Sequence, residues 1–153
     1  MGGSAVARGR GGPYEFVHQI WPAHPRHLAP LRSEVRRWLA PLALTADTED
    51  GLVRAAAEAA SNCVEHAYTP PTADDTVEVT FWTEPHAVYI EIVDQGRWQA
   101  PPDQPTHGGR GLQTMQRLTG FVLIHHDSRG TRVLLRHPLP DDPLTALHRA
   151  GEM

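Results

Sequence analysis

Hydrophobic and polar positions alternate along several short stretches of the chain, which is the pattern of β-strands with one covered face. In the second of these stretches, Val77, Val79 and Phe81 form the apolar side. Turn sequences separate the later stretches into two hairpins, one around Pro85 and one around the sequence DSRG. The predicted strands cover residues 14–21, 76–82, 87–93, 121–126 and 131–137.

Two longer segments repeat their apolar positions with the period of a helix. The first covers residues 26–40 and is closed by Pro41. The second is expected to begin at Asp47, a good N-cap, and to run to about Tyr68, where two prolines follow. One face of this helix is mostly alanine, so we expect it to pack close to its neighbour. A short third helix is expected at residues 112–118.

The order of these elements is β-α-α-β-β-loop-α-β-β, with strands in hairpin pairs and helices set between them. This order predicts an α+β fold in which a mostly antiparallel sheet is covered on one face by helices. Residues 94–111 form a long loop rich in proline and glycine, and such loops are usually functional or disordered. We expect a disordered leader at residues 1–13, one folded domain at residues 14–140 and a tail at residues 141–153.

Composition narrows the classes of function. The chain has 153 residues, enough for one domain with its own core. Its formal net charge of −4 provides no broad electrostatic basis for nucleic-acid binding. The single cysteine, Cys63, excludes an internal disulfide and fits a reducing cytoplasm. Neither a signal peptide nor an apolar run long enough for a membrane helix is present, so we expect a cytoplasmic protein without membrane contact.

The sequence EAASNCVEHAY, residues 58–68, places polar side chains on one face of the second helix. Glu58 and Asn62 share that face because they are four residues apart. Glu65 and His66 extend it by another turn. Considered alone, this pattern favours a solvated helix surface, in which His66 complements the negative end of the helix dipole.

Three further motifs favour a binding site over a solvated helix surface. In IVDQG, Asp94 closes a strand and could accept a hydrogen bond from a ligand, while Gly96 would let a flat ligand approach the backbone. In HGGRGL, residues 107–112, glycines precede a helix, and such N–H groups suit phosphate, although the lysine of a P-loop is absent. In RGTRV, residues 129–133, a Gly-Thr pair enters the last strand. Each motif alone would be interpreted as a turn or a flexible loop.

In this order and spacing, the four motifs together resemble those of the GHKL (Bergerat-fold) ATPase superfamily. Its four boxes are an Asn-bearing helix, an Asp-x-Gly strand end, a glycine lid and a Gly-Thr pair. The helix motif and the short chain resemble the anti-sigma factor branch, whose members are protein-serine kinases. The resemblance covers residues 14 to about 137. It implies a two-layer α/β sandwich with a mixed, mostly antiparallel sheet, a histidine kinase-like ATPase domain at residues 14–140, and ATP and Mg²⁺ as cofactors.

The resemblance also implies roles for single residues. Glu58 would be the catalytic base that takes a proton from a protein serine. Asn62 would bind Mg²⁺ through its amide oxygen, because this ion keeps waters and phosphate oxygens as its other ligands. Asp94 would bind the adenine amino group. The other residues expected to contact the nucleotide are His66, Gly96, Trp98, His107, Gly109, Arg110, Gly111, Leu112 and Thr131.

Two of these positions depart from the commonest pattern of the superfamily. Trp98 stands where a second glycine is frequent, and it could cover the base or pack the lid. An arginine often precedes the Gly-x-Gly of kinase-active members and reaches the γ-phosphate. Here His107 lies near that position and Arg110 lies between the glycines. Either could supply positive charge, His107 only when it is protonated.

The function implied is that of an ATP- and Mg²⁺-dependent protein-serine kinase. It would phosphorylate an anti-anti-sigma protein and sequester a sigma factor, and a homodimer is a further expectation. Phosphorylation would add about two negative charges to the substrate serine and expel that protein from the interface. The alternative is a nucleotide-binding regulatory module without kinase activity. The ATPase domain of a sensory histidine kinase is less favoured, because no dimerisation helices with a phosphoacceptor histidine precede residue 14.

Overall fold

The computed structural model describes residues 5–8, 15–68, 70–96 and 120–139. Within them, six strands form one sheet in the order β1-β2-β3-β4-β6-β5. Every neighbouring pair is antiparallel. The strands are β1 Ala5–Arg8, β2 Glu15–Pro22, β3 Thr76–Glu84, β4 Ala87–Asp94, β5 Phe121–Asp127 and β6 Gly130–Pro138.

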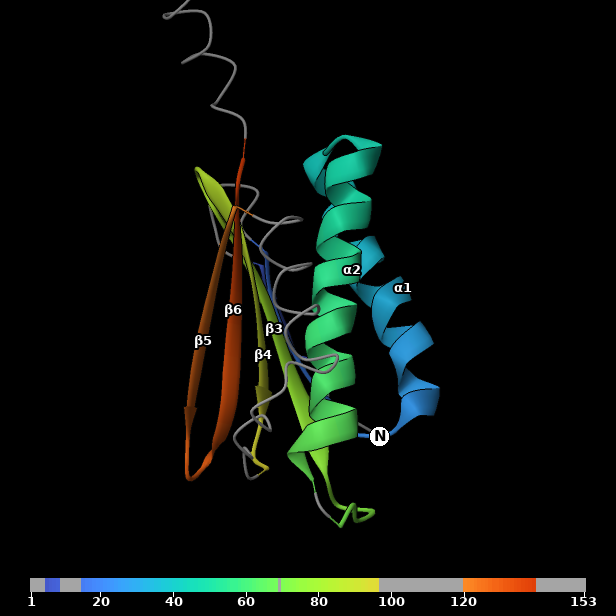
Figure 1. Ribbon diagram of the computed structural model, residues 1–153. Helices are drawn as coiled ribbons and strands as arrows, with labels where there is room; N and C mark the ends of the chain where they lie inside the picture. Colours follow the sequence, from blue (N-terminus) through green and yellow to red (C-terminus); the bar gives the residue numbers. More distant parts are fainter. Residues whose placement is uncertain (1–4, 9–14, 69, 97–119, 140–153) are drawn as a thin grey trace, which may run out of the picture.

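The described helices lie on one side of this sheet, as Figure 1 shows. They are α1 Leu28–Leu39 and α2 Ala46–Asn62, and α2 continues into the π-helical turn η3, Cys63–Ala67. Short 3-10 turns, η1 Pro25–His27 and η2 Ala40–Leu42, flank α1. The predicted α+β fold, with helices covering one face of a mostly antiparallel sheet, is therefore confirmed, and among the described strands no pair is parallel. Within the described part of the chain, no helix has the length and apolar character needed to cross a membrane.

Helix α2 begins two residues earlier than the sequence pattern suggested. Thr45 has an extended backbone conformation, and its side-chain oxygen accepts a hydrogen bond from the backbone N–H of Thr48 at 3.2 Å. Thr45 is therefore the N-cap, while Asp47 and Glu49 lie in the first turn, where negative charge complements the helix dipole.

The core lies between α1, α2 and the covered face of the sheet. The buried face of α2 is mostly alanine, as predicted, and these short side chains let the helix pack directly against β4 and β6. Helix α1 contributes larger side chains; the Trp38 ring, for example, lies 5.7 Å from that of Phe81. The residues of β3 and β4 that face this core are Val77, Val79, Phe81, Val88, Ile90 and Ile92.

We expected residues 1–13 to be a disordered leader, but Ala5–Arg8 form strand β1, which pairs with β2. An edge strand needs only backbone pairing with its neighbour, so a short segment can join a sheet without a long apolar run. The short helix expected at residues 112–118 lies outside the described residues.

Candidate functional site

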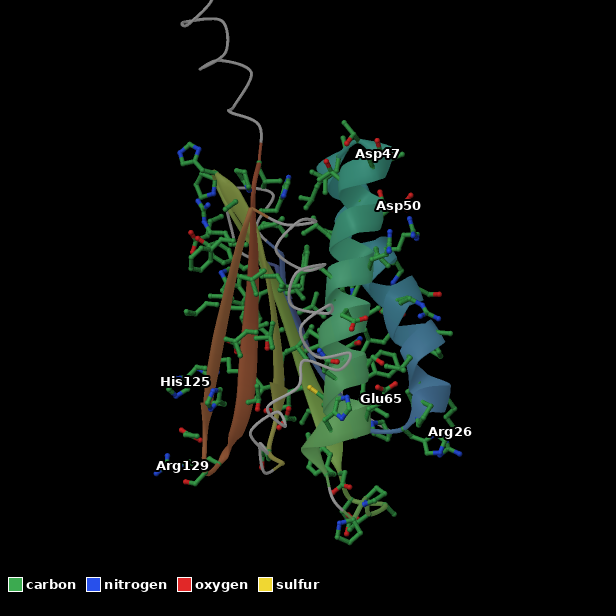
Figure 2. All side chains as sticks on the ribbon, viewed as in Figure 1. Arg26, Asp47, Asp50, Glu65, His125 and Arg129 are labelled. Atoms are coloured by element: carbon green, nitrogen blue, oxygen red, sulfur yellow. The ribbon has the colours of Figure 1, made fainter. Side chains whose placement is uncertain are left out.

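The polar stripe of the sequence lies along the last turns of α2 and on η3. Glu58 and Asn62 are half-buried, whereas Glu65 and His66 are exposed. Figure 2 labels Glu65 at the end of α2 that is opposite to Asp47 and Asp50. The exposed residues contact each other, since the Nε2 atom of His66 lies 3.6 Å from Oε2 of Glu65. Glu58 and Asn62 are therefore the two members of the stripe that are partly enclosed by the fold.

Asp94 is the last residue of β4 and is only 4% exposed. Its Oδ1 atom accepts a hydrogen bond from the backbone N–H of Gly96 at 3.1 Å and another from the backbone N–H of Thr131 at 3.2 Å. Asp94 and Thr131 are also register partners in the β4–β6 pairing. The sheet thus brings together two of the predicted site residues that are far apart in the sequence.

The surroundings of Asp94 influence its ionisation in two directions. Burial raises the pKa of its carboxyl group, while hydrogen bonds from the Cys63 thiol and from the N–H groups of Gly96 and Thr131 partly offset that rise. Burial also raises the pKa of the Cys63 thiol well above its usual value, and the nearby charge of Asp94 adds to this shift. The thiol is therefore a protonated donor beside the carboxylate. A carboxylate accepts about four hydrogen bonds, so capacity remains for a ligand donor.

Glycines allow close packing on both sides of Asp94. A side-chain carbon on Gly96 would overlap the carbonyl group of Ala67 at the end of η3. One on Gly130 would overlap the carbonyl oxygen of Asp94, and Gly130 has a φ of 147°, which L side chains rarely adopt. The sequence suggested that Gly96 leaves room for a ligand. The structure adds that it leaves room for the backbone of η3.

Sequence reasoning missed three residues that shape this site. In the sequence, Cys63 served only to exclude an internal disulfide; in the structure it is buried and interacts with Asp94. Gly130 was recognised as part of the Gly-Thr pair, but its close packing against the backbone of Asp94 was not predicted. Tyr68 donates a hydrogen bond from its hydroxyl to the carbonyl oxygen of Thr76 at 2.6 Å and accepts one from the N–H of Gln95 at 3.0 Å. The only sequence signals were the position of Tyr68 at the helix end and the glycine before Thr131.

The remaining predicted site residues are not among those that the structure describes. They are Trp98, His107, Gly109, Arg110, Gly111 and Leu112. Among the described residues, no group of three or more histidine, cysteine, aspartate or glutamate side chains could hold a metal ion by itself. The described part of the site therefore consists of the end of α2 with η3, the end of β4 and the start of β6.

Comparisons with known proteins agree with this arrangement. Residues 21–137 match the family described as "Histidine kinase-like ATPase domain". Among solved structures, the RsbU and RsbW domains of Rv1364c from Mycobacterium tuberculosis align with a TM-score of 0.64 and 23% identity, over 82% of this chain and 33% of that one. The histidine kinase domain of the blue-light activated histidine kinase EL346 from Erythrobacter litoralis aligns with a TM-score of 0.53 and 18% identity, over 77% of this chain and 61% of that one.

Each comparison supports a different part of the assignment. At these identities the two structures show a shared fold, and the chain spans about a third of the mycobacterial protein and under two thirds of the other. The family match covers most of the chain and includes the helix, strand-end and Gly-Thr motifs. The chain therefore belongs to the histidine kinase-like ATPase domain family of the GHKL superfamily.

Proposed function

We propose that the chain binds ATP with Mg²⁺ between the end of α2, the end of β4 and the start of β6, and transfers its γ-phosphoryl group to a protein serine. The observation that carries the proposal is the buried carboxylate of Asp94, which two backbone N–H groups hold through one oxygen. Such a fixed acceptor suits a neutral donor such as the adenine amino group. A buried carboxylate with unused acceptor capacity is typical of a binding site rather than of a core.

The phosphate end of the nucleotide would lie along the polar face of α2. Asn62 is half-buried and directly precedes Cys63, which interacts with Asp94, so the proposal assigns the amide and the carboxylate to one site. One amide oxygen fits Mg²⁺, which usually takes few protein ligands and binds nucleotide phosphates and waters at its other positions. When bound, the ion would neutralise part of the phosphate charge.

Glu58 lies one helical turn before Asn62 on the same face, so in this proposal its carboxylate would lie on the phosphate side of the site. It would accept the proton of a serine hydroxyl as the serine oxygen bonds to the γ-phosphorus. The bond from that phosphorus to the oxygen of the β-phosphate would break, and ADP would leave. The serine would belong to an anti-anti-sigma protein. Once phosphorylation had expelled that protein, the chain would be free to hold a sigma factor.

Nucleotide binding can be tested by calorimetry with ATP and Mg²⁺ on the full chain. Asp94→Ala should weaken ATP binding by about 10- to 100-fold, because a hydrogen bond to a charged group contributes roughly 1.5–3 kcal/mol. Asp50→Ala is the control, since Asp50 is an exposed carboxylate at the other end of α2. Equal ATP affinity in wild type and Asp94→Ala would remove the adenine assignment.

Phosphoryl transfer needs a separate test with labelled ATP, Mg²⁺ and candidate anti-anti-sigma proteins. Glu58→Gln should lower the transfer rate by at least about 100-fold, as expected for loss of a general base, with little change in ATP affinity. Glu65→Gln, an exposed carboxylate on the same helix end, should leave the rate unchanged. ATP binding without transfer to any candidate would instead support a regulatory binding module.

A further inference from the structure

The C-terminal end of α2, with η3 and Tyr68, contacts three successive residues at the end of β4: Asp94, Gln95 and Gly96. The thiol of Cys63 interacts with the Asp94 carboxylate. The Tyr68 hydroxyl accepts a hydrogen bond from the N–H of Gln95, and the backbone of Ala67 lies against Gly96. The π-helical geometry of η3 widens the last turn, and such turns occur frequently at functional sites. The turn that carries Asp94 is thus supported by the helix that carries Asn62.

The hydroxyl of Tyr68 has two partners of different kinds. It accepts a hydrogen bond from Gln95 and donates one to the carbonyl oxygen of Thr76, the first residue of β3. Burial raises the pKa of this hydroxyl, so it stays protonated at neutral pH and remains able to donate. Tyr68 therefore links the start of β3 to the end of β4 on the helix side of the sheet.

The bond to Gln95 has a direct consequence for Asp94. The N–H of Gln95 and the C=O of Asp94 belong to the same peptide unit, which is planar. Tyr68 holds the N–H end of this plane, and Gly130 packs against its carbonyl oxygen. A plane held at both ends sets the backbone rotation of Asp94 and hence the direction in which its side chain leaves the strand.

We propose that Tyr68 is a positioning residue for the nucleotide base: its hydroxyl fixes the Asp94–Gln95 peptide plane and so aims the Asp94 carboxylate at the amino group of adenine. The inference rests on the proposed role of Asp94 in binding ATP. Gln95 is exposed, so its N–H can bind water if the hydroxyl is lost. Removing the hydroxyl should therefore disturb the direction of the carboxylate more than the fold as a whole.

The test compares two ligands that differ only in the amino group: ATP and purine riboside triphosphate. Tyr68→Phe keeps the ring and removes the hydroxyl. Tyr89→Phe is a matched control, because Tyr89 also loses a side-chain hydrogen bond, from Arg136 at 3.2 Å, on the uncovered face of the sheet. Calorimetry should show the preference for ATP falling by about threefold or more in Tyr68→Phe, as expected for a hydrogen bond of ordinary strength that is misaligned, and remaining unchanged in Tyr89→Phe.

A purely structural role for Tyr68 would weaken both ligands in parallel, and an unchanged ratio would overturn the proposal. Amide hydrogen exchange of Gln95 in the nucleotide-free protein provides a second measurement, which does not depend on ATP binding. The exchange should be faster in Tyr68→Phe than in wild type and in Tyr89→Phe, and equal rates would also overturn the proposal. If wild type binds neither ligand, the proposed function fails, and the exchange rates alone then decide whether Tyr68 holds the turn.

Discussion

At Asp94, burial and hydrogen bonding act on the carboxyl group in opposite directions. Burial raises its pKa, and the donors around it compensate only in part, so the pKa stays above the usual value. A buried charge that is not fully compensated costs folding free energy. The fold therefore retains a side chain that opposes its own stability at neutral pH, which is common for residues that serve a ligand.

Replacing the Asp94 carboxylate with an amide tests how much folding free energy the buried charge costs. Asp94→Asn should unfold at a higher temperature than wild type at neutral pH, because the amide oxygen can still accept the two N–H groups without a buried charge. Folding raises the pKa of Asp94, so the folded wild type binds a proton more readily than the unfolded chain. The wild type should therefore lose stability relative to Asp94→Asn as the pH rises through the raised pKa. At pH values below the ordinary carboxyl pKa the two proteins should converge.

Thermal unfolding followed across the acidic and neutral range would measure this difference. The same variant should bind ATP more weakly than wild type. An Asp94→Asn protein that is less stable than wild type at every pH would show that the charge supports the fold instead.

At the scale of elements, the two ends of α2 have different structural roles. Its N-terminal end starts the helix through the hydroxyl of Thr45, while its C-terminal end continues into η3 and supports the candidate site. Positions that stabilise the helix are therefore separated from those that contact a ligand. Changes at the first end should alter stability and leave the site intact.

Thr45→Ala removes the side chain that accepts the N–H of Thr48. It should lower the free energy of unfolding by about 1 kcal/mol, the usual value for losing an N-cap. Thr45→Ser should recover most of that loss, because serine provides the same acceptor. Chemical denaturation measures both, and equal stability of wild type and Thr45→Ala would contradict the capping role.

The sequence pattern predicted α2 well because prolines follow it and its alanine face has a clear helical period. The pattern missed the cap by two residues, since Asp47 and Thr45 are both good N-caps and only the backbone geometry separates them. It also missed η3 and the role of Tyr68. These depend on contacts with Gln95 and Thr76, which come close only after the sheet has formed.

At the scale of the whole molecule, the two faces of the sheet differ. The helices cover one face, and its strand residues are buried. On the other face the rings of Trp82 and Tyr89 stack at 4.9 Å, and Arg136 lies over Tyr89. Its large apolar residues at the outer strands are about half exposed: Phe16, Ile20, Phe121 and Leu123. The stability of the fold should therefore depend on one face far more than on the other.

The same substitution on each face tests this asymmetry. Leu135→Ala, on the covered face of β6, should cost about 2–5 kcal/mol because this side chain is fully buried. Leu123→Ala, on the open face of β5, should cost less than about 1 kcal/mol because the side chain is 51% exposed. Urea denaturation gives both values. Similar losses would mean that the open face is covered in solution.

Alternation along the strands predicted a sheet with one covered face, and the structure agrees. It could not predict the strand order, in which β4 lies next to β6 and β5 is at the edge. Hairpin patterns identify partners within a pair of strands, but not which edges of two hairpins meet. Asp94 and Thr131 are close because β4 pairs with β6. The resemblance of the motifs suggested this proximity, whereas the hydrophobic periodicity did not.

Strand β4 ends at Asp94, opposite Thr131, whereas β5 begins at Phe121, opposite Arg136 near the other end of β6. Any segment that joins β4 to β5 must therefore reach from one end of β6 to the other, which sets a lower limit on its length.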